Sequence, residues 1–160
     1  MQVYILRHGI AEDVKPGGND SDRALTNEGR KKLREVLRLA EKADVVPSLI
    51  LTSPYVRAVQ TAEAVIEVLG YANDLLRTEA LVPSADPRDI WEEMRVHQGV
   101  MQLMLVGHEP MMSKLVAFLL NSPGLMVDVK KGALLRVDID TFGLQPRGVL
   151  KWMAVPKLAA

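Results

Sequence analysis

Short apolar runs alternate with longer amphipathic segments along the first three-quarters of the chain. Residues 3–6, 49–51 and 101–106 are almost continuously apolar, which is typical of strands that are buried on both faces. Between them, apolar residues recur at a spacing of three and four, which favours helices with one buried face. We expect helices over 26–43, 87–97 and 110–120, a further helix whose apolar positions run from 59 to 69, and a weaker strand over 75–80.

The last quarter of the chain has a different pattern. Leu135, Val137 and Ile139 alternate with polar residues, and a loop rich in Gly and Pro leads to a second extended segment over 149–155. Alternation at a spacing of two indicates strands with one polar face, so we expect an antiparallel pair at one edge of the sheet. The whole pattern predicts one α/β domain over residues 1–160, a three-layer α/β/α sandwich around a mixed, mostly parallel sheet.

Composition and charge remove several classes of function. The chain is 48% apolar and 25% charged, as in ordinary globular proteins, and its 20 basic and 20 acidic residues cancel. Binding of nucleic acids or anionic membranes usually depends on a positive field, which a net charge of zero does not supply. The absence of cysteine excludes disulfides, thiolate nucleophiles and Cys-ligated metals.

The N-terminal segment has no basic region, and the longest later apolar run, 115–120, is far shorter than the roughly 20 residues of a membrane span. We therefore expect a cytoplasmic protein that binds neither nucleic acids nor membranes.

Arginine and histidine residues follow the expected strands, at the end of the sheet where open α/β folds bind ligands. Arg7 and His8 follow the first strand, Arg57 comes one turn after Ser53-Pro54, and His108 follows the 101–106 strand. If these strands are parallel and adjacent, the four side chains lie together. Two arginines can hold and neutralise a phosphoryl group without a metal. The sequence therefore predicts a phosphoryl-binding site that contains a nucleophile.

The two histidines suit different tasks in such a site. A neutral histidine can attack phosphorus through one ring nitrogen while the other donates a hydrogen bond to a carbonyl. We assign this role to His8, and expect His108, protonated or as a neutral donor, to stabilise charge on the phosphoryl oxygens. Ser53 is expected to cap the next helix and Pro54 to begin it, so that the helix's positive end faces the same site.

Four ordered motifs resemble those of the histidine phosphatase superfamily, also called the phosphoglycerate mutase-like family. They are Arg7-His8-Gly9, Arg23-Ala24-Leu25-Thr26 with Gly29, the segment from Ser53 to Ala62, and Val106-Gly107-His108. The first nine residues and the short length are most similar to the SixA group of phosphohistidine phosphatases. The resemblance implies that His8 becomes transiently phosphorylated, that Arg7, Arg57 and His108 bind the phosphoryl group, and that water hydrolyses the intermediate.

The general acid is the point at which this sequence departs from many members of the superfamily. Glu79, near the end of the weak strand, is the positional candidate, and Glu12, Asp13 and Asp22 on the loop after the first strand are rivals. An imidazole leaving group can depart already protonated, so a weak or missing acid favours phosphohistidine over alkyl phosphates. Arg23 is open to two interpretations, a contact at the rim of the substrate site or a surface residue of the loop.

Only about 50 residues separate Arg57 from His108, which leaves no room for the large cap insertion that many members of the superfamily carry there. A site without a cap is accessible to a phosphorylated side chain of another protein. We therefore predict a monomeric, metal-independent phosphatase that needs no cofactor and acts on phosphohistidine in a partner protein, such as a phosphotransfer domain or a phosphocarrier. Two alternatives stay open: a phosphatase for small phosphate esters at the same site, and a non-catalytic phosphohistidine-binding module.

Overall fold

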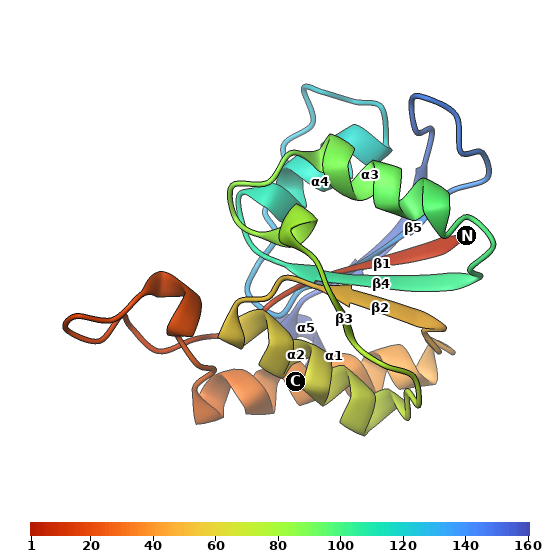
Figure 1. Cartoon of the computed structure of the whole chain (residues 1–160). Coiled ribbons are helices and arrows are strands. Elements are labelled where there is room, and N and C mark those ends of the chain that lie inside the picture. Colours follow the sequence, from red (N-terminus) through yellow and green to blue (C-terminus); the bar gives the residue numbers. More distant parts are fainter.

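A computed structural model describes all 160 residues and contains one six-stranded sheet with the order β3-β2-β4-β1-β5-β6 (Figure 1). The strands are β1 (Gln2–Arg7), β2 (Leu49–Thr52), β3 (Leu76–Arg77), β4 (Gln102–Gly107), β5 (Leu134–Asp138) and β6 (Val149–Ala154). The pairs β1–β4, β2–β4 and β2–β3 are parallel, whereas β5 runs antiparallel to both β1 and β6. The predicted mixed, mostly parallel sheet with an antiparallel edge pair is thereby confirmed.

Helices cover both faces of this sheet, as the three-layer prediction requires (Figure 1). The helices α1 (Asn27–Lys42), α2 (Val56–Leu69) and α5 (Pro156–Ala159) lie on one face, and α3 (Pro87–Val96) and α4 (Met111–Leu119) lie on the other. Two 3-10 turns, η1 (Asp20–Asp22) and η2 (Glu79–Leu81), interrupt the loops that follow β1 and β3. No helix has the length and apolar character needed to cross a membrane.

The sheet separates two hydrophobic cores, and the apolar strands contribute side chains to both of them. In β1, Val3 and Ile5 belong to the core beneath α3 and α4, while Tyr4 and Leu6 belong to the core beneath α1 and α2. All four are at most 1% exposed. Because successive strand residues point to opposite faces, a strand buried on both sides must be apolar at every position.

Two expected boundaries are wrong. The helix after β2 begins at Val56 with Tyr55 as its N-cap residue, so Ser53 does not cap it and Pro54 does not begin it. The Ser53 hydroxyl is used elsewhere, because it accepts a hydrogen bond from the Tyr55 amide and lies 2.8 Å from His108 Nε2. The third strand is only two residues long, because the side chain of Thr78 accepts from the Ala80 amide and starts η2.

The parallel arrangement places the carboxyl ends of β1, β2 and β4 side by side. The chain that leaves β1 continues into a segment that projects from the body of the molecule before α1 begins (Figure 1). An isolated antiparallel bridge between Ala11 and Leu25 closes the base of this projecting segment, residues 12–24. At the start of α1, the Thr26 side chain accepts from the Gly29 amide, as a helix cap does.

Candidate active site

Three of the four predicted phosphoryl-binding or reacting residues form one buried cluster at the carboxyl ends of β1, β2 and β4. The ring centroids of His8 and His108 are 4.9 Å apart. Arg57, in the first turn of α2, donates from Nε to His8 Nε2 over 3.3 Å. The exposed fractions of His8, Arg57 and His108 are 5%, 4% and 1%. The parallel strands therefore bring together residues that are 49 to 100 positions apart in the sequence.

The contacts of His8 define its tautomer. Nδ1 lies 2.7 Å from the Gly9 carbonyl oxygen, and Nε2 faces the Arg57 Nε–H donor. A carbonyl accepts and a guanidinium donates, so Nδ1 carries the proton and Nε2 the lone pair. Burial lowers the pKa of His8 to about 3, and the positive charges of Arg57 and Arg7 act in the same direction against the hydrogen bond to Gly9. His8 is thus a neutral imidazole whose lone pair, on the nitrogen that faces the cluster, accepts the hydrogen bond from Arg57.

His108 is also neutral near pH 7. Burial lowers its pKa to about 3, with further contributions from His8 and Arg57. Its Nε2 lies 2.8 Å from Ser53 Oγ, and the Tyr55 ring packs against it with 5.0 Å between centroids. Of the two forms expected for this residue, the low pKa therefore favours the neutral imidazole over the imidazolium.

Arg7 approaches the cluster from the end of β1. Its Nη1 donates to the carbonyl of Val129 over 2.7 Å, and its charge lowers the pKa of both histidines. Arg7 Nε and His108 Nδ1 are the two buried side-chain polar atoms without a hydrogen-bond partner. A buried polar atom without a partner is unfavourable, so the cluster is suited to a ligand that brings further polar atoms.

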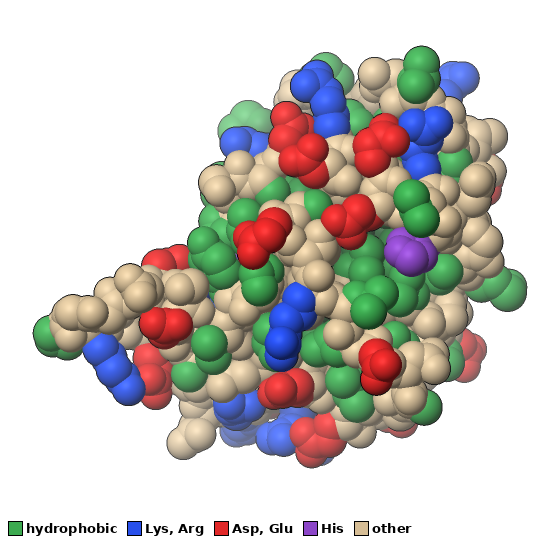
Figure 2. All heavy atoms as spheres, viewed as in Figure 1, with side chains coloured by type: hydrophobic (Ala, Val, Ile, Leu, Met, Phe, Trp, Pro, Cys, Tyr) green, Lys and Arg blue, Asp and Glu red, His purple; other side chains and the backbone are tan.

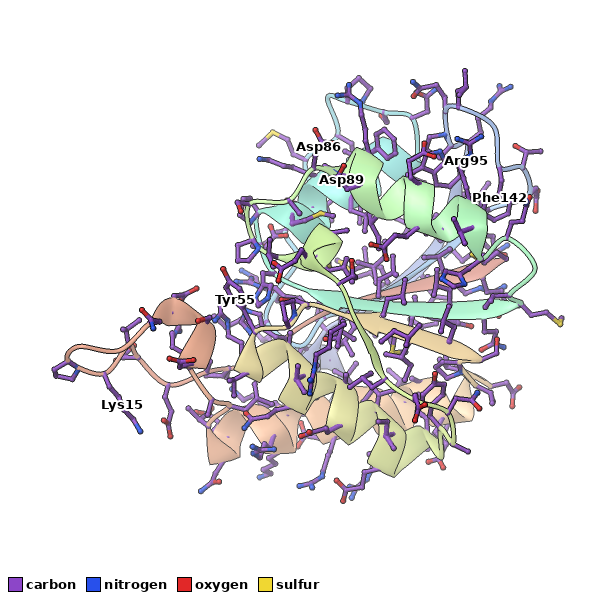
Figure 3. The ribbon with its side chains drawn as sticks, viewed as in Figure 1. Lys15, Tyr55, Asp86, Asp89, Arg95 and Phe142 are labelled. Atoms are coloured by element: carbon purple, nitrogen blue, oxygen red, sulfur yellow. The ribbon has the colours of Figure 1, made fainter.

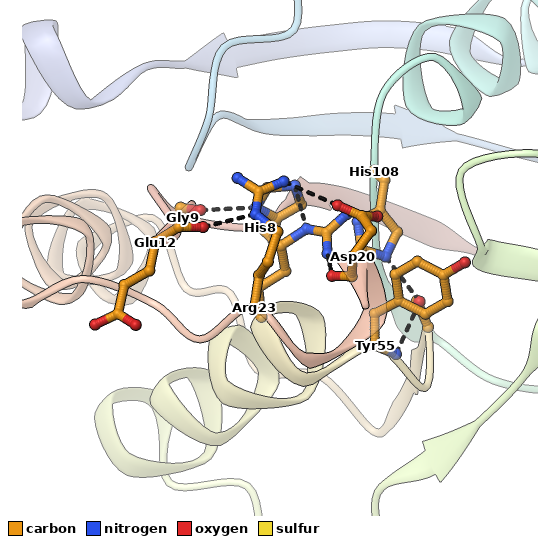
Figure 4. A network of polar contacts seen from close by, with 9 residues as sticks. His8, Gly9, Glu12, Asp20, Arg23, Tyr55 and His108 are labelled. Atoms are coloured by element: carbon orange, nitrogen blue, oxygen red, sulfur yellow. Dashed lines mark hydrogen bonds and ion pairs between the residues drawn. The ribbon is translucent and has the colours of Figure 1, made fainter. Parts of the chain in front are cut away.

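Asp20 is a site residue that the sequence analysis missed (Figure 4). Its Oδ2 accepts from Arg57 Nη2 over 3.0 Å, and its backbone carbonyl accepts from Arg57 Nη1 over 2.7 Å. The other carboxylate oxygen accepts from Arg23 Nη1 over 3.0 Å, and Arg23 Nε donates to the Glu12 carbonyl. Hydrogen bonds from Arg23 and Arg57 hold the pKa of the Asp20 carboxyl below its usual range, so this group is an ion and not a proton donor.

Arg23 contacts Asp20 and not the histidines, and its role at the rim of the substrate site stays a prediction. Tyr55 is a second residue that no sequence signal identified. It lies between the projecting segment, whose tip carries Lys15, and the layer that contains α3 and α4 (Figure 3). Besides packing against His108, its ring lies 5.3 Å from the Arg57 guanidinium carbon, so it helps to enclose the cluster on the α2 side.

The structure brings none of the four candidate acids into polar contact with the histidines. Glu79 is the first residue of η2 and is exposed, and its carboxylate makes no hydrogen bond or ion pair. Glu12, Asp13 and Asp22 are exposed on the projecting segment, and their carboxylates are likewise unpaired. The assignment of a general acid stays a prediction.

Known proteins share both the sequence pattern and the fold. The family model of the histidine phosphatase superfamily (branch 1) matches residues 3–81. The phosphohistidine phosphatase SixA of Escherichia coli (strain K12) is 28% identical over 98% of this chain and 94% of its own. A phosphohistidine phosphatase SixA homolog of Haemophilus influenzae is 31% identical over 73% of this chain and 76% of its own.

Solved structures agree with the sequence relatives. The protein histidine phosphatase SixA complexed with tungstate superposes with a TM-score of 0.87 at 27% identity, over the full length of both chains. The alpha-ribazole phosphatase of Shigella flexneri has the same fold, with a TM-score of 0.72 at 17% identity over 98% of this chain and 97% of its own. The chain therefore belongs to the histidine phosphatase superfamily, resembles its SixA members over its whole length, and is a phosphatase.

Proposed function

We propose that this phosphatase removes the phosphoryl group from phosphohistidine on a partner protein through a phosphorylated His8 intermediate, without a metal or cofactor. The observation that carries the proposal is the state of His8. Its Nε2 lone pair is held beside Arg57 and His108, while Nδ1 is fixed by the Gly9 carbonyl. A nucleophile for phosphorus needs this neutral form, and the low pKa of about 3 keeps it available at neutral pH.

In the first step, His8 Nε2 attacks phosphorus, and the bond between phosphorus and the substrate imidazole breaks. The leaving imidazole departs with a proton already bound to it, so no protein acid is required. Arg57 must release its contact with Nε2 as the new bond forms, and its Nε–H then points toward a phosphoryl oxygen. Arg7 and the neutral donor His108 bind the remaining oxygens, whose charge two permanent cations can balance.

In the second step, water attacks the phosphorus of phospho-His8, the nitrogen–phosphorus bond breaks, and both protons of the water leave with the inorganic phosphate as H2PO4⁻. Nε2 regains its lone pair and the starting state returns. The hydrogen bond between Nδ1 and Gly9 favours one ring orientation throughout, so the imidazole does not need to reorient between the two attacks.

Two observations support a protein substrate. The SixA relatives are named phosphohistidine phosphatases, and the solved SixA is named a protein histidine phosphatase. Between α2 and β4 this chain has only β3, η2 and α3, of which α3 packs on the sheet in the outer layer. No inserted subdomain encloses the cluster, so a histidine on a folded phosphotransfer domain or phosphocarrier can reach it.

The strands of the single sheet come from residues 2 to 154, almost the whole length of the chain. This supports the proposal of a single domain over 1–160.

The test uses purified protein and a phosphocarrier domain phosphorylated on histidine, without added metal. We expect release of inorganic phosphate by the wild type and none by His8→Ala. The matched control is His97→Ala, since His97 ends α3 and makes no contact with the cluster, and this variant should keep full activity. Rapid quenching at alkaline pH should trap acid-labile phosphate on the wild-type protein and not on His8→Ala. Equal phosphate release by His8→Ala would overturn the mechanism.

A further inference from the structure

A groove of about 550 Å³ opens beside Arg7. Its lining residues, which we call the basic groove, are Arg7, Ile10, Lys32, Lys130, Lys131, Val155, Pro156 and Lys157. Five of them carry a positive charge and none carries a negative charge. In a chain whose net charge is zero, this is a local concentration of cations that composition alone does not reveal.

The basic groove is joined directly to the nucleophile. Arg7 and Ile10 flank the His8-Gly9 pair in the sequence. The loop that carries Lys130 and Lys131 is fixed to the end of β1, because the Gly132 amide donates to the His8 carbonyl over 3.0 Å and Arg7 Nη1 donates to the Val129 carbonyl. A ligand whose phosphoryl group reaches His8 therefore has its neighbouring atoms within reach of this surface.

Two of the lysines have no acidic partner in the protein. Lys32 is paired with Glu28 at 2.8 Å, and Lys130 with Asp128 at 2.7 Å. Lys131 and Lys157 are exposed and make no salt bridge. They come from different elements, the loop before β5 and the helix α5. Unpaired ammonium groups on two elements suit a ligand with several separated negative charges better than a single small anion.

The projecting segment, whose Asp20 contacts Arg57, has the reverse character. The projecting segment carries Glu12, Asp13, Asp20 and Asp22 against only two cations, Lys15 and Arg23. On the face of the molecule in Figure 2, acidic and basic side chains are mixed. An acidic ligand segment would thus be attracted to the basic groove and repelled by the projecting segment, which would orient it.

We propose that the basic groove binds acidic side chains that lie beside the phosphohistidine of the protein substrate. This inference rests on the function proposed above and adds to it the charge of the partner surface. Exposed ion pairs are individually weak, so the two unpaired lysines should together raise kcat/KM about fivefold for an acidic substrate. The effect should weaken with salt, because the Debye length shortens to about 4 Å near 0.5 M ionic strength.

The experiment compares two phosphohistidine peptides of equal length, one with glutamates on both sides of the phosphohistidine and one with glutamines. At low salt the wild type should hydrolyse the glutamate peptide with a kcat/KM about fivefold higher, and the preference should fall below about twofold in 0.5 M NaCl. Lys131→Glu combined with Lys157→Glu should reverse the preference. The matched control is Lys42→Glu with Lys151→Glu, which changes the net charge equally at exposed lysines outside the groove and should keep the preference.

The outcomes separate this inference from the proposed function. Equal hydrolysis of both peptides by the wild type, or an unchanged preference in the Lys131→Glu, Lys157→Glu protein, would overturn the basic groove as a docking surface and leave the phosphohistidine phosphatase intact. Phosphate release from neither peptide, and none from free phosphohistidine, would overturn the proposed function and this inference with it.

Discussion

At the scale of single residues, the Asp20 carboxylate occupies the Arg57 guanidinium group that an incoming phosphoryl group needs. It lies 3.0 Å from both Arg57 Nη2 and Arg23 Nη1 and is itself half exposed. We expect Asp20→Asn to bind inorganic phosphate up to about fivefold more tightly, because a competing negative charge is removed. Isothermal titration of both proteins measures this. Asp22→Asn, at an unpaired carboxylate of the same turn, is the control, and weaker binding by Asp20→Asn would show that the carboxylate positions Arg57 instead.

A substitution at Glu79 tests whether departure of the leaving group requires a protein acid. Its carboxylate is exposed and unpaired, and a phosphohistidine substrate does not require a protein acid. We expect Glu79→Gln to lower kcat/KM for phosphohistidine by less than about tenfold, since loss of a working general acid costs roughly 10²–10⁴ in rate. Steady-state phosphate release from a phosphohistidine peptide decides the matter. A loss of a hundredfold or more would assign Glu79 as the acid.

The residues of the cluster differ in how far the sequence could predict them. His8, Arg57 and His108 each follow a strand at a short distance, so the strand pattern alone predicts where they meet. Asp20 is one of several acids on a polar loop, and its partner Arg57 lies 37 positions away. Tyr55 packs against His108 from the N-cap position of α2, two residues later than the cap that the Ser-Pro pair suggests. Loop conformation has no periodic signal, so both contacts required the structure.

At the scale of elements, the first turn of α1 packs against the chain that leaves β1. A Cβ on Gly29 would lie 2.2 Å from the Ile10 carbonyl oxygen and 2.9 Å from its amide nitrogen, and backbone cannot move aside as a flexible side chain can. We expect Gly29→Ala to lose about 1–3 kcal/mol of stability and to displace Ile10 and the neighbouring His8. Urea unfolding and phosphate release measure the two effects. Gly99→Ala, where nothing lies within 4 Å, is the control, and an unchanged unfolding midpoint in Gly29→Ala would contradict the expectation.

Most of the strands and helices could be predicted, because their buried positions must be apolar and this leaves a regular pattern in the sequence. The two errors arise where a side chain competes with the expected geometry. At Ser53 the hydroxyl bonds to Tyr55 and His108 in place of a helix end, and at Thr78 a side-chain hydrogen bond turns the chain after two strand residues. Hydroxyl side chains often bond to nearby backbone in this way, and the sequence does not reveal which partner they take.

At the scale of the whole molecule, the net charge of zero conceals an uneven distribution of charged side chains around the carboxyl ends of the strands. Cations gather at Arg7 and in the basic groove, while acids gather on the projecting segment. Two of the three histidines, His8 and His108, are buried at the same ends of the strands and are neutral. The cluster that the proposed reaction requires therefore also links the stability of the fold to pH.

We expect the free energy of unfolding to fall as the pH drops below about 6.5. In the folded protein His8 and His108 keep a pKa of about 3, whereas in the unfolded chain they take up protons near their ordinary pKa of 6.5. Between these values the unfolded state binds more protons, so each histidine should cost about 1.4 kcal/mol of stability per pH unit. Urea unfolding at pH 7, 6 and 5 measures the slope. His108→Gln should have a shallower slope than the wild type, while equal slopes in the two proteins would show that His108 is not held neutral by the fold.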